Sequence, residues 1–266
     1  MKHYARLLAL GLGLGVGATG FAQIIPLYSG ALNSTPDAQG WLYQNLPAGT
    51  AVVTPPGGSG YTTLNTSAAY LPYAGWAAVT PFNLDPAAGF RVRFDFKVLA
   101  EDHGASTADH SNPPDGLADR AGLSFIILGS DKKGIELGVW TDEIWGQTDT
   151  PMFEHHQSQE RGFVDTTGVG TGMAGLNRLD VTVIGGNYSV RFNDNLLYSA
   201  ATKDYTPFVG AIDPYETPNF LFLGDDTTSA SATFQFSYAE VELVPEPATL
   251  AALGIGLAAL ARRRRR

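Results

Sequence analysis

The sequence predicts an all-β sandwich, and three observations lead to this prediction. The chain of 266 residues contains 31 glycines, 16 prolines and 11% aromatic residues, which favours short strands joined by turns. Several segments alternate apolar and polar residues with the period of a strand. Between residues 23 and 243 no segment shows a convincing long helical period. Short strands with frequent turns are typical of a sandwich or a barrel.

The clearest strand is GFRVRFDFKVLA at 89–100. One of its faces is apolar and the other charged, with Phe90, Val92, Phe94, Phe96 and Val98 opposite Arg91, Arg93, Asp95 and Lys97. This alternation predicts a half-buried strand. The more continuous apolar run at 121–129 predicts a central strand, and GIELGVW at 134–140 follows it after a polar turn.

A series of hairpins follows. The runs 176–184 and 187–192 flank Gly185-Gly186, a two-residue hairpin signal. Further strands are expected at 196–199, 219–224 and 232–243, the last with Phe234, Phe236 and Tyr238 on one face. Residues 23–79 are rich in turns, and we interpret them as the first strands and covering loops of the same domain.

The two ends have the features of targeting segments. Residues 1–22 combine a basic start, an apolar run and a small residue at Ala22, which is the layout of a signal peptide cleaved after that residue. At the other end, a 14-residue apolar run at 248–261 precedes five arginines. As a helix it reaches about 21 Å, short of a hydrocarbon core of about 30 Å. It would hold the chain transiently in the inner membrane through Leu250, Leu253, Ile255, Leu257 and Leu260, with a cytoplasmic stop at Arg262, Arg263, Arg264, Arg265 and Arg266.

The segment Val244-Pro245-Glu246-Pro247, followed by the apolar run and the arginines, resembles the PEP-CTERM sorting signal of Gram-negative bacteria. The resemblance implies recognition by an exosortase, removal of the tail and release to the cell surface or extracellular matrix. The alternative is a plain membrane anchor. The expected organisation is a signal peptide at 1–22, a β-sandwich domain at 23–243 and a sorting signal at 244–266.

The segment 23–247 carries 10 basic and 26 acidic residues, a net charge of −16. This charge repels phosphate backbones and excludes a nucleic-acid partner. The chain has no cysteine, so it uses neither disulfides nor thiolate chemistry.

The stretches RLDVTVIGGNYSVRFNDNLLYSA and FLFLGDDTTSASATFQFSYAEVEL resemble the concanavalin A-like (laminin G, legume lectin) jelly roll in the order of their strands. The resemblance covers roughly residues 80–243. It implies a two-sheet sandwich, and together with the sorting tail it leads us to expect a protein that binds carbohydrate or exopolysaccharide.

The densest candidate site is GIELGVWTDEIWGQTD at 134–149. On a strand, Glu136, Gly138, Trp140 and Asp142 share one face, and Trp145 lies nearby. An aromatic plane can pack on the C–H faces of a sugar while carboxylates accept its hydroxyl protons, so we expect Glu136, Trp140, Asp142 and Trp145 to bind a saccharide. The alternative is that Trp140 fills the core and the acids are solvated.

A catalytic role is not expected. Some concanavalin A-like enzymes carry an E-x-D-x-x-E strand, which this chain lacks. Glu136 and Asp142 would lie about 20 Å apart along a strand, whereas the paired carboxyls of glycosidases lie roughly 5–10 Å apart. The alternatives to a non-enzymatic binding protein are a purely structural matrix protein and a polysaccharide hydrolase or lyase.

The acidic, turn-rich stretch at 101–120 offers hard oxygen ligands. Asp109, Asp115 and Asp119 could hold Ca²⁺, although their spacing does not match an EF-hand. The alternative is a solvated acidic loop. No cofactor is expected to be required.

Overall fold

The computed structural model describes residues 22–67, 73–103, 119–166, 176–210 and 212–244. These residues form fifteen strands and three short 3-10 helices: Gly30–Leu32, Asp37–Gln39 and His155–Gln157. All of the strands lie within one compact unit, Ala22–Val244, which has its own apolar core. A unit that contains its own core is expected to fold alone.

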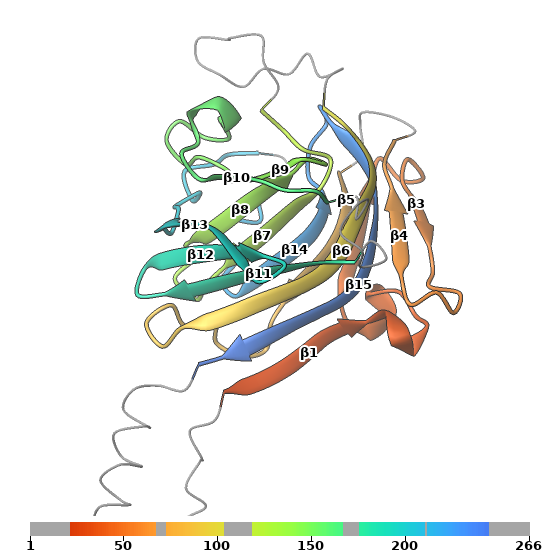
Figure 1. Ribbon diagram of the computed structural model, residues 1–266, viewed down its shortest axis with the longest axis horizontal. Coiled ribbons are helices and arrows are strands. Elements are labelled where there is room, and N and C mark those ends of the chain that lie inside the picture. The colour runs from red at the N-terminus through yellow and green to blue at the C-terminus, as the bar shows by residue number, and fades with distance from the viewer. Residues whose placement is uncertain (1–21, 68–72, 104–118, 167–175, 211, 245–266) are drawn as a thin grey trace, which may run out of the picture. The chain divides into compact units, whose positions relative to one another are not determined.

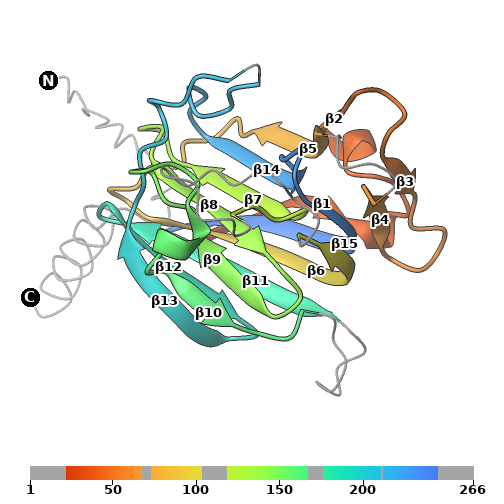
Figure 2. The ribbon, with the colours of Figure 1, turned by 90° about the horizontal axis from the view of Figure 1, so that it is seen from above.

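The strands form two antiparallel sheets, which confirms the prediction of an all-β sandwich (Figure 1). Sheet A contains, in order, β13 (Asn195–Ala201), β12 (Asn187–Phe192), β11 (Asn177–Ile184), β6 (Phe90–Asp102), β15 (Ser231–Leu243), β4 (Thr62–Asn65) and β3 (Val52–Thr54), and β1 (Gln23–Ser29) also pairs with β15. Sheet B contains, in order, β10 (Arg161–Phe163), β9 (Glu143–Gly146), β8 (Gly134–Val139), β7 (Ser124–Leu128), β14 (Phe220–Asp225), β5 (Tyr73–Val79) and β2 (Leu42–Leu46) (Figure 2).

The inner faces of the two sheets form the main core. The apolar face of β6 lies in it as predicted, with Phe90, Val92, Phe94, Phe96 and Val98 fully buried. Phe94 and Phe96 contact Phe125 of β7 across the sandwich, with ring centroids 4.7 and 5.1 Å apart. The alternation of β6 therefore determines which side of sheet A faces sheet B.

The charged face of β6 is paired with its neighbours on the outer side of sheet A. Arg93 lies opposite Asp180 of β11 and Glu240 of β15 and binds both carboxylates, at 2.8 and 3.0 Å. Arg178 of β11 binds Asp95 through two hydrogen bonds. Opposite charges directly across a strand pair stabilise the sheet, so this face of the sandwich needs no apolar cover.

The hairpin predicted at Gly185-Gly186 joins β11 to β12. Both glycines have positive φ, at 60° and 75°, which is the conformation that a two-residue turn of type I′ requires. A residue with a side chain at either position would be strained.

One predicted face is wrong at its last position. Phe234 and Phe236 of β15 enter the core, but the pairing of β15 with β6 shifts between Phe236 and Tyr238. This bulge places Ala239 and Val241 in the core and turns Tyr238 to the outer side, where its hydroxyl donates to Glu240 at 2.8 Å. The extra residue at a bulge moves all later side chains to the opposite face of the strand. The apolar residues before the bulge therefore do not predict the faces of the residues after it.

Candidate functional site

The outer face of sheet B is covered rather than exposed. On β8, Ile135, Leu137 and Val139 enter the main core, as the sequence predicts, so Glu136 and Gly138 face outward. Outward-facing residues of β5, β7 and β14 form a second apolar cluster with side chains from two covering segments. One of these segments contains Phe153, and the other contains Tyr205 and Tyr215. The buried members of the cluster are Ala77, Ile126, Leu128, Phe153, Tyr205, Tyr215 and Phe220.

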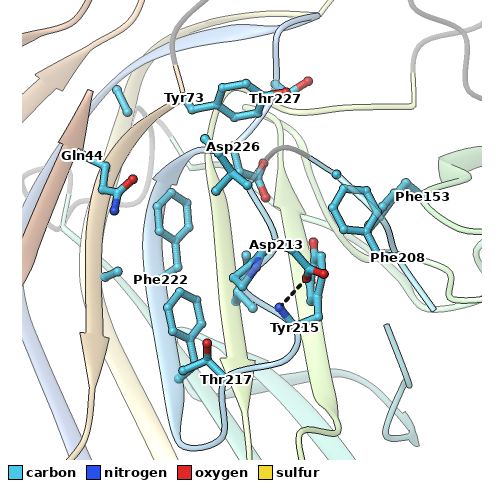
Figure 3. A pocket seen from close by; sticks show the side chains of 18 of the residues that line it. Gln44, Tyr73, Phe153, Phe208, Asp213, Tyr215, Thr217, Phe222, Asp226 and Thr227 are labelled. Carbon is cyan, nitrogen blue, oxygen red and sulfur yellow. Dashed lines mark hydrogen bonds between the residues drawn. The ribbon is translucent and has the colours of Figure 1, made fainter. Parts of the chain in front are cut away.

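This cover leaves a pocket of about 410 Å³ between the sheet and the covering segments, which is in the range of small-molecule sites. Six aromatic side chains line it: Tyr73, Phe153, Phe208, Tyr215, Phe220 and Phe222. Polar side chains also line the pocket: Gln44, Asp213, Thr217, Asp226, Thr227 and Thr228. Figure 3 shows Asp226 and Thr227 at one end of the pocket and Thr217 at the other.

Two glycines shape the floor of the pocket. Gly75 of β5 lies opposite Gly224 of β14, and both lie against the ring of Phe222. A Cβ atom at Gly75 would lie 2.7 Å from Cζ of Phe222 and 2.5 Å from the carbonyl oxygen of Leu223. The absence of side chains at this point lets the ring of Phe222 lie close to the sheet.

A largely buried cluster of charged and polar side chains, which consists of Arg120, Ser124, Glu136 and Asp226, lies at one end of the pocket. The guanidinium of Arg120 lies 3.5 Å from Oε1 of Glu136 and 3.4 Å from Oδ1 of Asp226. Ser124 donates to the same Asp226 oxygen at 2.8 Å. Although burial opposes its charge, the two carboxyl groups raise the pKa of Arg120, which therefore stays cationic.

Glu136 is fully buried beneath the pocket, and its Oε2 accepts a hydrogen bond from the hydroxyl of Tyr215. Burial and the nearby Asp226 carboxylate raise the pKa of Glu136 to about 8. Within the part of the chain that the structure describes, Oε1 of Glu136 and Oδ2 of Asp226 have no hydrogen-bond donor. Both carboxyl groups flank the guanidinium of Arg120. A proton on Glu136 relieves the repulsion between them.

The proton on Glu136 makes stability depend on pH. Between pH 4.5 and about 8 the folded protein keeps a proton that the unfolded chain releases, so its stability falls as the pH rises. Burial lowers the pKa of His155 from 6.5 to about 4, and this residue therefore reduces stability only as the pH falls below 6.5. From pH 6.5 to 8 we expect Glu136 by itself to remove roughly 2 kcal/mol from the free energy of unfolding. Although burial opposes it, the hydrogen bond to Glu101 raises the pKa of His103 above 6.5, so this residue lowers the stability in the same direction as the pH rises.

Urea unfolding at a series of pH values tests this. The Glu136→Gln variant should lose the share of the decrease between pH 6.5 and 8 that Glu136 contributes, whereas Glu216→Gln, at an exposed position, should keep it. The share of His103 is present in both variants. Asp225, whose pKa burial also raises, is present in both variants and contributes equally to each. An unchanged profile in Glu136→Gln would mean that this residue is ionised in the folded protein.

The residues that the sequence analysis grouped with Glu136 lie elsewhere. Strand β8 ends at Val139, and the turn that follows leaves Asp142 exposed. Trp140 is only 8% exposed and Trp145 is fully buried, with ring centroids 4.6 Å apart. The expected exposed aromatic plane is therefore not formed, because other rings pack on Trp140.

Trp140 and Trp145 belong instead to a packed ring cluster, which we call the tryptophan cluster and which also contains His103 and His155. His103 stacks on Trp140 at 3.8 Å, and His155 contacts Trp140 at 4.2 Å. A Cβ atom at Gly138 would lie 2.3 Å from the Trp145 ring, so this glycine provides the space that Trp145 occupies. None of the tryptophan-cluster residues lines the pocket.

Of the three aspartates expected to bind Ca²⁺, Asp109 and Asp115 lie outside the described residues. Asp119 is buried, and its carboxylate accepts the backbone N–H of His155 at 3.0 Å. Among the residues that the structure describes, no group of three or more His, Cys, Asp or Glu side chains could hold a metal ion.

Most of the pocket residues were not predicted from the sequence. Phe220 and Phe222 alternate with Leu221 and Leu223 on β14, which is a signal of two apolar faces and hence of a second cluster outside the core. Phe208 and Asp213 come from a covering segment without regular secondary structure, where no periodicity marks them.

The C-terminal residues 243–266 match the PEP-CTERM protein-sorting motif. This confirms the sorting signal expected around Pro245-Glu246-Pro247, and the motif implies export through a membrane-anchored intermediate in Gram-negative bacteria and processing by an exosortase. The expected signal peptide and C-terminal apolar helix lie outside the described residues. In the described parts of the chain, no helix has the length and apolar character needed to cross a membrane.

No curated protein matches the chain in sequence. A carbohydrate esterase from the Shiga toxin-encoding bacteriophage phi24B has a similar structure, at 14% identity and a TM-score of 0.48, and the match covers 83% of this chain and 99% of the esterase chain. The carbohydrate recognition domain of Emp46p is similar at 10% identity and a TM-score of 0.42, over 81% of this chain and 94% of that domain. A Bacillus subtilis protein of galectin-like fold is similar at 10% identity and a TM-score of 0.44, over 85% of this chain and 100% of its own. Likenesses at this level identify neither a ligand nor an activity.

Proposed function

We propose that this exported protein binds carbohydrate in the pocket on the outer face of sheet B, without cleaving it, at the cell surface or in the extracellular matrix. The observation that supports this is the combination of six aromatic side chains with carboxylate, hydroxyl and amide groups around one opening. Aromatic rings pack on the apolar faces of sugars, and the polar groups fix the orientation of the ligand. We further propose that the sandwich is of the concanavalin A-like class, as the strand order in the sequence suggests.

The burial of Glu136 argues for binding rather than cleavage. The two carboxyl groups of a glycosidase flank the scissile bond at roughly 5–10 Å from each other. Here Glu136 is fully buried, with Arg120 close to one of its carboxyl oxygens and the Tyr215 hydroxyl bound to the other. A saccharide in the pocket could reach Glu136 only if these side chains moved.

One observation favours a second candidate, a polysaccharide hydrolase or lyase. Two carboxyl groups lie together at a pocket, and the pKa of one is raised to about 8. Perturbed acids of this kind are enriched at catalytic sites. A structural matrix protein without a ligand is the third alternative.

One experiment separates the three candidates. The Ala22–Val244 unit is purified and passed over immobilised bacterial and algal polysaccharides, with and without Ca²⁺, and soluble products are assayed for new reducing or unsaturated ends. We expect retention without new ends. New ends would replace the binding proposal with the enzymatic one, and an absence of both across the panel would favour the structural protein. Retention that depends on Ca²⁺ would assign a role to the acidic loop at 101–120.

Phe208 provides the sharpest test of where the ligand binds. It lies on a covering segment and contacts the rings of Phe153 and Tyr215 at the edge of the pocket. We expect Phe208→Ala to weaken binding of a retained oligosaccharide by about 0.5–1.5 kcal/mol, roughly 2- to 12-fold, by calorimetry. Phe163→Ala is the matched control, because Phe163 is 77% exposed on β10 and does not line the pocket. Equal affinities in the two variants would place the ligand outside the pocket.

A further inference from the structure

We propose that the pocket selects saccharides that carry a protonated amino group, such as sugars with a free rather than an acetylated amine. This inference rests on the proposed function, since it names the class of saccharide that the same pocket would take. It follows from three features of the pocket: its cation is already paired, its remaining charge is negative, and its walls are aromatic.

Arg120 is the cation among the described lining residues, and it is already paired with carboxyl groups. Its two terminal nitrogens lie at 3.5 and 3.4 Å from Glu136 and Asp226, and its guanidinium lies 4.7 Å from the centre of the Phe153 ring. Its side chain is only 9% exposed. A uronate or sulfated sugar would have to compete with two carboxyl groups for a buried guanidinium, at a large desolvation penalty.

The charge that remains at the pocket is negative. The charged side chains among the described lining residues are Arg120, Asp213 and Asp226, which together have a net charge of −1. The buried Glu136 adds no charge when it is protonated. Asp213 is exposed, and one of its oxygens accepts the backbone N–H of Tyr215 at 3.0 Å (Figure 3). Its carboxylate is therefore held at the pocket by its own turn and is accessible to a ligand from solvent.

The aromatic walls add a second attraction for a cation. Rings hold positive charge over their faces, with about 0.5–2 kcal/mol for each favourable contact. Phe208 and Tyr73 line the pocket together with the acidic groups. At longer range, the net charge of −16 over residues 23–247 repels polyanions and attracts polycations. All of these effects favour a positively charged ligand.

Calorimetry on the Ala22–Val244 unit tests the proposal with two probes of equal length: glucosamine oligomers, and their N-acetylated counterparts, at a mildly acidic pH that protonates the free amine. We expect the glucosamine oligomer to bind about tenfold more tightly. Asp213→Asn should remove most of this preference while keeping an oxygen for the Tyr215 N–H. Glu216→Gln removes the same charge from an exposed position on the same segment outside the pocket, and it should keep the preference.

The outcomes distinguish this inference from the function on which it rests. Equal binding of the two oligomers, or tighter binding of a uronate oligomer, would overturn the selection for an amine and leave carbohydrate binding intact. A preference that Asp213→Asn and Glu216→Gln reduce equally would assign it to the general charge of the protein, and would also overturn the pocket as its source. Absence of binding to any saccharide would overturn both proposals. Thermal unfolding of each variant shows whether the fold is retained.

Discussion

The Arg120→Met variant loses about 3–5 kcal/mol of unfolding free energy, the largest electrostatic effect that we expect in this protein. Arg120 is buried between Glu136 and Asp226, and its side chain is only 9% exposed. Methionine fills much of the same space but provides no charge, so Asp226, whose side chain is only 15% exposed, is left beside a second carboxyl group that is fully buried. A buried carboxylate without its partner is strongly destabilising. Urea unfolding at neutral pH measures the loss.

A double variant identifies the cause of this loss. Adding Glu136→Gln to Arg120→Met removes one of the two carboxyl groups, and we expect it to recover part of the lost stability, whereas adding Glu216→Gln should recover none. The interaction energy between positions 120 and 136 follows from the cycle of single and double variants. A loss below about 1 kcal/mol in Arg120→Met would mean that water reaches the cluster and screens it.

The Trp145→Ala variant is expected to lose about 3–5 kcal/mol of unfolding free energy while keeping its affinity for saccharide. Trp145 is fully buried in the tryptophan cluster, against Trp140, His155 and Gly138, and it does not line the pocket. Its removal leaves a cavity that the neighbouring rings fill only in part. Thermal and urea unfolding give the loss, and calorimetry well below the melting temperature gives the affinity.

Phe163→Ala is again a suitable control, since an exposed side chain on the neighbouring strand β10 should change stability by less than about 0.5 kcal/mol. A Trp145→Ala variant that keeps its stability and loses its affinity would return the binding site to the face that the sequence analysis proposed. Stability and affinity together therefore show whether Trp145 stabilises the fold or binds the saccharide.

The sequence predicts the strands well where apolar residues alternate with polar ones. The run at 187–192 became β12 with the same bounds, and the run at 232–243 became β15 with one further residue. The inward faces of β6 and β8 were also predicted, because alternation with a period of two has only one arrangement that buries every apolar residue.

The candidate site was predicted less well, and for a different reason. Whether Trp140 is exposed depends on where β8 ends and on the packing of His103 and His155, which come from distant parts of the chain. Glu136 was expected to face solvent, and its strand does direct it away from the core. The segment that contains Tyr205 and Tyr215 then covers it. Periodicity describes one strand at a time and contains no information about such a cover.

By itself, the sequence determined the all-β class, the core faces of β6 and β8, the Gly185-Gly186 hairpin and the sorting motif at the C-terminus. These features depend on neighbours in the chain, on local backbone geometry and on the burial of apolar side chains. Only the tertiary structure decided that the outer face of sheet B is covered, that Arg120 joins Glu136 to Asp226, and that Phe208 and Asp213 line the same pocket. Those arrangements bring distant parts of the chain onto one sheet, and their energies arise only when packing removes the groups from water.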